Sequence, residues 1–252
     1  MTQVGFWLTD GSTPAAEIVA ETGYDFVVLD IEHGMFDLET LDRFIPLLRN
    51  LGLKVFAKVR EPSAAAIQQP LDFGATGVIV PHVTTAQHAE ELARFAKYPP
   101  RGERSMAGGR LFRYGPWTDE RMSELDSETL FFPLVEHPLA VRDIDLIAGL
   151  ENVDGFQMGP GDLSLMSGRG AFSQTDADWA DIERCVDAMQ QRGKPWMYPA
   201  WTETELNWAL SRKAPYIIVS AQYAAFRQAA DIIRSRTSSA IKTAKRAAEP
   251  AQ

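Results

Sequence analysis

The chain has 252 residues, of which 45% are hydrophobic and 23% charged, an ordinary composition for a globular protein. Its net charge of −9 disfavours binding to nucleic acid and to anionic membranes, and no apolar run approaches the roughly 18 residues of a membrane span. The amino terminus lacks the basic and apolar regions of a signal peptide, which favours a cytoplasmic location.

Strand-like and helix-like segments alternate along nearly the whole chain. Apolar runs of strand length predict strands, and amphipathic segments closed by a glycine such as Gly23, Gly52 or Gly74 predict helices between them. The predicted strands cover residues 5–8, 26–30, 54–59, 77–81, 130–135, 155–158, 195–198 and 216–220. The predicted helices cover residues 13–22, 38–50, 64–73, 85–97, 119–128, 140–150, 179–192, 203–211 and 224–236.

Two long segments interrupt this alternation. Residues 101–117 contain four arginines, four glycines and three aromatic residues, and residues 159–177 are rich in glycine and serine. Both are predicted to be loops, and loops of this length in a compact domain tend to be functional. Residues 237–252 are predicted to form a C-terminal tail that frays or lies on a neighbouring subunit.

Eight strands, each followed by a helix, predict an α/β fold in which residues 1–252 form a single-domain (β/α)8 TIM barrel. Closure of the sheet leaves no exposed strand edge. A doubly wound open sheet is the alternative. That fold expects a glycine-rich phosphate-binding turn after its first strand, whereas residues 9–13 contain one glycine.

Several predicted strands end in charged residues or histidine. Because the carboxyl ends of barrel strands meet on one rim, these side chains are expected to form an active site there. Glu32 is expected to turn outward, toward a nearby amide or arginine. The other rim residues are Asp30, His33, Arg60, Glu136 and Asp162.

Glu136 and Asp162 come from successive strand ends and offer oxygen ligands suited to Mg²⁺ or Mn²⁺. A solvated acid pair, or a helix cap at Asp162, is the alternative. Asp30 precedes His33 by three residues and is placed to orient the imidazole as a base, although a bond from His33 to a loop carbonyl stays open.

Arg60 supplies donors for a carboxylate or a developing enolate oxygen, with an ion pair to a neighbouring glutamate as the alternative. Trp7 either lines the pocket or belongs to the core. Lys58 lies two residues before Arg60 on the same strand, so a Schiff-base mechanism also stays open. Together these residues favour metal-assisted enolisation of a 2-oxo acid.

The order of these motifs resembles the metal-dependent (class II) pyruvate aldolases. That family includes 4-hydroxy-2-oxoheptanedioate aldolase, 2-dehydro-3-deoxyglucarate aldolase and macrophomate synthase, within the phosphoenolpyruvate/pyruvate barrel superfamily. The resemblance extends from Trp7 to about Arg236 and includes the 26-residue step from Glu136 to Asp162. Its motifs lie at residues 29–33, 60, 77–81, 98–104, 135–136 and 159–164.

The resemblance implies a carbon–carbon lyase that joins or cleaves a 2-oxo acid, pyruvate or hydroxypyruvate, and a small aldehyde. It implies that Glu136 and Asp162 bind a divalent metal ion, Mg²⁺ or Mn²⁺ with Co²⁺ as a further option. It also implies that Arg60 contacts the keto or enolate oxygen and that His33, paired with Asp30, is the base.

The resemblance further implies that the amides around Gly161 and Asp162 receive the substrate carboxylate, with Trp7 near the pocket. Relatives commonly form hexamers of two trimers with a swapped C-terminal helix, so a homotrimer or hexamer is expected. This chain departs from them at Leu134, where relatives that act on long dicarboxylates often carry glutamine, and has large aromatics within residues 194–198. These departures predict a tight pocket for a small aldehyde.

Two other functions are compatible with this pattern. One is a CoA-thioester lyase of the citryl or malyl type on the same barrel, although no nucleotide-binding surface is identifiable in the sequence. The other is a barrel that binds a metabolite without catalysis. Metal-stimulated turnover distinguishes an enzyme from a binding protein, and a thioester cleavage assay distinguishes the two lyases.

Overall fold

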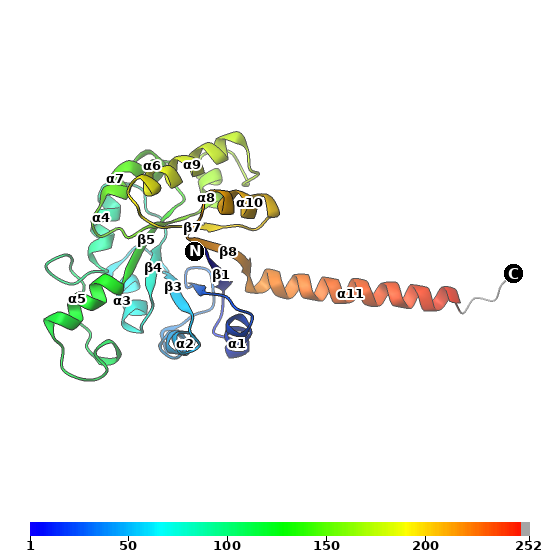
Figure 1. Cartoon of the computed structure of the whole chain (residues 1–252), viewed down its shortest axis with the longest axis horizontal. Helices are drawn as coiled ribbons and strands as arrows, with labels where there is room; N and C mark the ends of the chain where they lie inside the picture. Colours follow the sequence, from blue (N-terminus) through cyan, green and yellow to red (C-terminus); the bar gives the residue numbers. More distant parts are fainter. Residues whose placement is uncertain (248–252) are drawn as a thin grey trace.

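Eight parallel strands close into a barrel in chain order within residues 1–247, the part of the chain that this computed structural model describes. The predicted single-domain (β/α)8 barrel is therefore confirmed (Figure 1). The strands are β1 (Gln3–Leu8), β2 (Phe26–Asp30), β3 (Lys54–Lys58), β4 (Gly77–Val80), β5 (Leu130–Val135), β6 (Phe156–Met158), β7 (Trp196–Pro199) and β8 (Tyr216–Ala221).

Helices surround the strands, and α11 alone among the labelled helices extends away from the barrel (Figure 1). The first group is α1 (Thr13–Glu21), α2 (Leu38–Asn50), α3 (Ala64–Asp72), α4 (Ala86–Arg94), the short 3-10 helix η1 (Gly109–Phe112) and α5 (Asp119–Glu128). The second is α6 (Pro138–Arg142), α7 (Ile144–Gly149), α8 (Pro160–Met166), α9 (Asp176–Gln191), α10 (Glu203–Ser211) and α11 (Gln222–Ala247).

Helix α2 shows how the sequence determines these elements. The Asp37 carboxylate accepts the backbone N–H of Thr40 at 2.7 Å and caps the first turn. One face of the helix is then buried against the barrel, as the apolar spacing predicts. The buried residues of that face are Leu41, Phe44, Ile45 and Leu48.

Three helices differ clearly from the predicted elements. Helix α8 lies inside the predicted loop 159–177, where Pro160 occupies the first helical position with its φ already suited to a helix. The predicted helix 140–150 is divided at Asp143, whose side chain accepts the backbone N–H of Ala86 at 3.2 Å. Helix α11 continues through most of the predicted tail, of which residues 248–252 lie outside the described part.

Aromatic side chains fill the amino-terminal half of the barrel interior. Phe26, Phe56, Phe132 and Tyr216 pack with ring centroids 5.4–6.1 Å apart. Gly5 makes room for this layer, because a Cβ atom there would clash with the ring of Phe26. Asp30 and Lys58, the last residues of β2 and β3, lie beyond this layer toward the carboxyl-terminal end.

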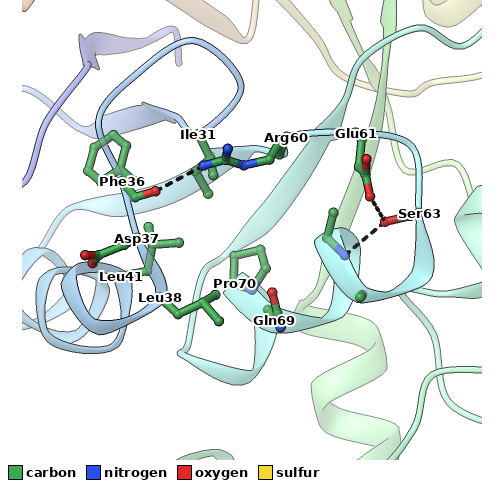
Figure 2. Close-up of a pocket in the computed structure, with 12 residues that line it drawn as sticks. Ile31, Phe36, Asp37, Leu38, Leu41, Arg60, Glu61, Ser63, Gln69 and Pro70 are labelled. Carbon is green, nitrogen blue, oxygen red and sulfur yellow. Dashed lines mark hydrogen bonds between the residues drawn. The ribbon is translucent and has the colours of Figure 1, made fainter.

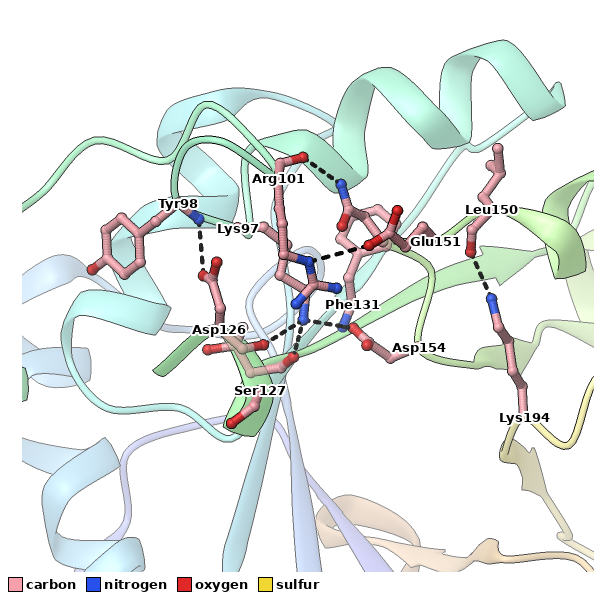
Figure 3. A network of polar contacts seen from close by, with 12 residues as sticks. Lys97, Tyr98, Arg101, Asp126, Ser127, Phe131, Leu150, Glu151, Asp154 and Lys194 are labelled. Carbon is pink, nitrogen blue, oxygen red and sulfur yellow. Dashed lines mark hydrogen bonds and ion pairs between the residues drawn. The ribbon is translucent and has the colours of Figure 1, made fainter. Parts of the chain in front are cut away.

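A buried lysine connects the end of α5, before β5, with the residue Asp154 before β6. Lys97 is 1% exposed, and its Nζ lies 2.8 Å from the carbonyl oxygen of Asp126, 2.5 Å from that of Thr129 and 3.1 Å from Oδ2 of Asp154 (Figure 3). Asp154 also accepts the backbone N–H of Phe131. We call Lys97, Asp126, Thr129 and Asp154 the amino-end network, because it fixes backbone at the amino-terminal end of the sheet.

Helix α11 leaves several large apolar side chains in contact with solvent. They are Tyr223, Phe226, Ile232, Ile233 and Ile241. Within residues 1–247, no helix combines the length and apolar character that a membrane crossing requires.

Candidate active site

Side-chain alternation places an acid and a lysine inside the barrel at its carboxyl-terminal end. Val28 and Phe56 belong to the interior core, so Asp30 and Lys58, two residues further along the same strands, also face inward. Asp30 and Lys58 are register partners on β2 and β3. Both are buried.

Asp30 connects the strand ends to the loop after β2. Its Oδ2 accepts the Trp7 indole N–H at 3.0 Å, and its Oδ1 accepts the backbone N–H of His33 at 3.1 Å. Lys58 Nζ lies 3.7 Å from Oδ1. Asp30 therefore fixes the backbone position of His33, while the imidazole ring has a different partner.

Glu32 is that partner, and it contacts three basic side chains. Its Oε2 lies 2.5 Å from Lys58 Nζ and 3.5 Å from His33 Nε2, and its Oε1 lies 2.9 Å from His82 Nε2. The Glu32 side chain is only 9% exposed. The expectation that Glu32 turns outward was wrong, because the buried Lys58 ammonium draws the carboxylate into the barrel.

Glu136 lies directly after β5 and is 5% exposed. Its Oε1 accepts the backbone N–H of His82 at 2.7 Å and lies 3.5 Å from His82 Nδ1. Burial raises the pKa of the Glu136 carboxyl and the charge of Asp162 adds to this rise, whereas the His82 N–H and Lys58 oppose it. His82 has a left-handed backbone with φ of 59°, a conformation that costs a non-glycine residue free energy.

Asp162 lies in the first turn of α8 and is exposed. Gly159 precedes it, and a Cβ atom there would lie 2.8 Å from Cβ of Glu136, so only glycine lets this backbone pass so close. A buried carboxyl with a raised pKa beside a second carboxylate suits a hard divalent cation that completes its coordination with water and substrate. Among residues 1–247, no group of three or more His, Cys, Asp or Glu side chains is arranged to hold a metal ion.

Arg60 follows the end of β3 by two residues and extends toward the segment before α2. Its Nη2 donates to the carbonyl oxygen of Phe36 at 3.3 Å, and the residue lines a surface pocket of about 370 Å³ that also includes Ile31 and Pro70 (Figure 2). Strand β3 ends at Lys58, so its alternation does not extend to Arg60. The residue as a whole is exposed.

The remaining predicted residues lie at the same end of the barrel. Trp7 is half-buried, and Lys58 Nζ lies 5.7 Å from the centre of its ring. Gly161 is exposed in α8, with no heavy atom within 4 Å of the position that a Cβ would occupy. We call the polar groups at this end the mouth cluster. It comprises Trp7, Asp30, Glu32, His33, Lys58, His82, Glu136 and Asp162.

The sequence did not predict the ion pairs that connect Lys58, Glu32 and His82. Alternation from the interior Phe56 was the signal that could have identified Lys58 as an ion-pair partner of the loop after β2. The position of His82 directly after a buried strand was a weaker signal, because its left-handed backbone is not visible in the sequence.

Comparison with known proteins identifies the family of the chain. The sequence pattern of the family described as HpcH/HpaI aldolase/citrate lyase matches residues 3–190. A 2-keto-3-deoxy-L-rhamnonate aldolase of Salmonella dublin is 28% identical over 249 residues, which is 97% of this chain and 93% of that protein. The Klebsiella pneumoniae protein of the same name is 30% identical over 240 residues, covering 91% of this chain and 86% of that one.

A solved structure shares the whole architecture. The crystal structure of an HpcH/HpaI aldolase from Desulfitobacterium hafniense superposes with a TM-score of 0.84 and 28% identity, covering 99% of this chain and 94% of that one. The predicted resemblance to the pyruvate aldolases and the predicted class of enzyme are both confirmed. The chain belongs to the HpcH/HpaI aldolase/citrate lyase family and is a carbon–carbon lyase of the aldolase type.

Proposed function

We propose that the mouth cluster cleaves and forms a carbon–carbon bond between a 2-oxo acid, pyruvate or hydroxypyruvate, and a small aldehyde, with a divalent metal ion as cofactor. The observation that carries this proposal is the buried Glu136 carboxylate beside Asp162 at the carboxyl end of the barrel. The site donates only oxygen ligands from the protein, which favours Mg²⁺ or Mn²⁺, with Co²⁺ as a further option.

Glu136 and Asp162 are the proposed metal ligands. A bound divalent cation supplies positive charge to the carboxylate and keto oxygens of the 2-oxo acid. The His82 backbone N–H holds Oε1 of Glu136, which fixes the orientation of the carboxyl group. The amide groups of Gly161 and Asp162, in the first turn of α8, have no acceptor within the helix and are proposed to bind the substrate carboxylate.

His33 is the proposed base that moves the proton at the carbon next to the keto group. Its side chain is 65% exposed at the mouth, so a substrate reaches it, and the Asp30 carboxylate fixes its backbone. Glu32 lies 3.5 Å from His33 Nε2 and stabilises the ring when it carries the proton. Asp30 is thus a positioning residue in this proposal.

Arg60 is proposed to donate to the keto or enolate oxygen when substrate is bound. Its contact with the Phe36 carbonyl is a single long hydrogen bond of 3.3 Å, which an anionic ligand competes with readily. Trp7 lies beside Asp30 and is proposed to form one wall of the substrate site.

The names of the relatives suggest the first substrate to test. We expect 2-keto-3-deoxy-L-rhamnonate, incubated with the protein and Mn²⁺, to release pyruvate, and EDTA to stop the release. The Glu136→Gln variant is the matched control and is expected to release none. Pyruvate release that EDTA leaves unchanged would contradict the proposed metal site.

A thioester lyase is the second candidate, because the matching family includes citrate lyases. The same protein preparation is therefore tested with a citryl thioester of coenzyme A. Cleavage of the thioester without aldol cleavage would replace the aldolase proposal by this one.

We further propose that the protein acts in the cytoplasm as a homo-oligomer, a trimer or hexamer. The exposed apolar residues of α11 support the homo-oligomer, because a helix that extends from its own barrel needs a partner surface to bury them. Light scattering of the full chain tests the assembly, and a monomer at micromolar concentration would contradict it.

A further inference from the structure

The proposed reaction assigns no role to the most deeply buried cation of the mouth cluster. Lys58 is 6% exposed, with its Nζ 2.5 Å from Oε2 of Glu32, 3.7 Å from Oδ1 of Asp30 and 5.7 Å from the centre of the Trp7 ring. Burying a lysine and a carboxylate together costs desolvation free energy that their mutual attraction offsets only in part. The position of this pair therefore calls for a functional explanation.

The geometry around Glu32 indicates what the pair does. With Oε2 held by Lys58, Oε1 faces His82 Nε2 at 2.9 Å, and the same Oε2 lies 3.5 Å from His33 Nε2. One carboxylate thus contacts both imidazoles of the mouth cluster. Neither imidazole is buried, so these contacts restrict rings that would otherwise be free to rotate.

His82 extends this connection to Glu136. Its ring contacts Glu32, while its backbone N–H donates to Glu136 Oε1 at 2.7 Å from a left-handed conformation. A strained backbone persists only when surrounding contacts hold it. Lys58, Glu32, His82 and Glu136 form a continuous chain of contacts from the barrel interior to the proposed metal ligand.

We propose that the Lys58–Glu32 ion pair is a positioning device for the active site, which holds His33 over the substrate and His82 against Glu136. This inference rests on the proposed aldolase function. Lys58 is a positioning residue in it and not a Schiff-base nucleophile, because its ammonium is committed to Glu32 and has no free electron pair to attack a carbonyl. Replacing the pair slows turnover without removing the substrate site.

The chain provides a matched control on the same strand. Lys54 begins β3, faces the interior like Lys58, and its Nζ lies 5.8 Å from the centre of the Tyr216 ring at the opposite end of the barrel. Lys58 and Lys54 are therefore the same residue type on the same strand, and each lies near an aromatic ring. They differ in their ion pairs: of these two lysines, only Lys58 has carboxylate partners among residues 1–247.

The test compares Lys58→Met, Glu32→Gln/Lys58→Met and Lys54→Met with the unmodified chain. Lys58→Met leaves the carboxylates of Glu32 and Asp30 without their cation and is expected to lower the melting temperature. The double variant also removes the charge of Glu32 and is expected to restore part of the loss. The readout is metal-dependent exchange of the pyruvate methyl protons in D₂O. We expect the double variant to lose about 10- to 100-fold in kcat with KM little changed, and Lys54→Met to match the unmodified chain.

Two results would overturn the proposal. The first is a stable double variant that exchanges at the rate of the unmodified chain, or that loses activity through KM alone. The second is a covalent adduct on Lys58 after borohydride treatment with pyruvate, which would make Lys58 the nucleophile.

A second measurement needs no activity and separates this inference from the proposed function. The chain has four histidines, so imidazole NMR spectra of the metal-free protein contain few signals. We expect the double variant to shift the signals of His33 and His82 and to leave that of His88, on α4, unchanged. If the unmodified chain shows no exchange but these shifts occur, the aldolase proposal fails and the positioning role stands; unshifted signals overturn the role.

Discussion

Two buried lysines at opposite ends of the barrel contact very different partners. Lys97, at the amino-terminal end, contacts the backbone carbonyls of Asp126 and Thr129 as well as Asp154 (Figure 3). Lys58, at the carboxyl-terminal end, forms ion pairs with the side-chain carboxylates of Asp30 and Glu32, and Glu32 in turn contacts His33 and His82. The first lysine fixes backbone and the second orients reactive groups, which is the division of labour expected between the two ends of such a barrel.

The largest effect should follow loss of a carboxylate at the mouth. Glu136→Gln is expected to abolish metal-dependent exchange of pyruvate protons, because one of two proposed metal ligands loses its charge, and Asp162→Asn should do the same. Melting temperature of the metal-free protein should not fall, since the neutral amide avoids the burial cost that raises the pKa of Glu136. Asp126→Asn, a buried acid of the amino-end network, is the control and should retain exchange. Full metal-dependent activity in the Glu136→Gln variant would contradict the proposal that Glu136 is a metal ligand.

Arg60 is expected to have the next largest effect. Arg60→Ala should slow proton exchange by about 10²-fold, the loss typical of a donor to a developing oxyanion. Stability should hardly change, because Arg60 is exposed and makes one hydrogen bond to the Phe36 carbonyl. Exchange at the normal rate would mean that Arg60 keeps its position beside Phe36 during turnover and acts outside the chemistry.

Lys97 should affect stability and not catalysis. Lys97→Met leaves two carbonyl oxygens without a donor and Asp154 without its cation, so the free energy of unfolding in urea should fall by about 2–4 kcal/mol. The kcat of the folded variant should equal that of the unmodified chain. A selective loss of kcat without loss of stability would break the contrast between the two ends.

The same lysine should produce a smaller effect of pH. Burial lowers the pKa of Lys97 in the folded protein below its usual value of 10.5. At a pH just below 10.5 the unfolded chain therefore binds more protons than the folded one. The free energy of unfolding should therefore rise as the pH increases toward 10.5. The measurement is urea unfolding at neutral pH and just below pH 10.5, where Lys97→Met should lack this rise in the free energy of unfolding. The same rise in both proteins would show that Lys97 does not cause it.

Much of the fold was predictable because local signals agree with burial. Strand β2 (Phe26–Asp30), helix α2 (Leu38–Asn50) and strand β5 (Leu130–Val135) begin and end where the sequence predicted. Each is a buried apolar run or a capped amphipathic segment. Helix α8 was missed because its flanking glycines favour a loop, and the burial of Leu163 within it is not visible in the sequence.

The residues that reach this rim were predictable, but the contacts between their side chains were not. Strand ends identified Asp30, His33 and Glu136, since strand order alone brings them to one rim. The partner of the His33 ring was not predictable, because the turn after β2 ends the alternation and a buried Lys58 draws Glu32 inward. Side-chain directions beyond a strand end depend on tertiary contacts that the sequence does not display.

Exchange of the pyruvate methyl protons in D₂O, followed by NMR with Mg²⁺ or Mn²⁺ and then with EDTA, tests the central claim most directly. It detects the enolate step without knowledge of the aldehyde. The mouth cluster predicts exchange that requires the metal ion and disappears with EDTA. Exchange that EDTA leaves unchanged, or no exchange with either pyruvate or hydroxypyruvate, would contradict a metal-assisted enolate at Glu136 and Asp162.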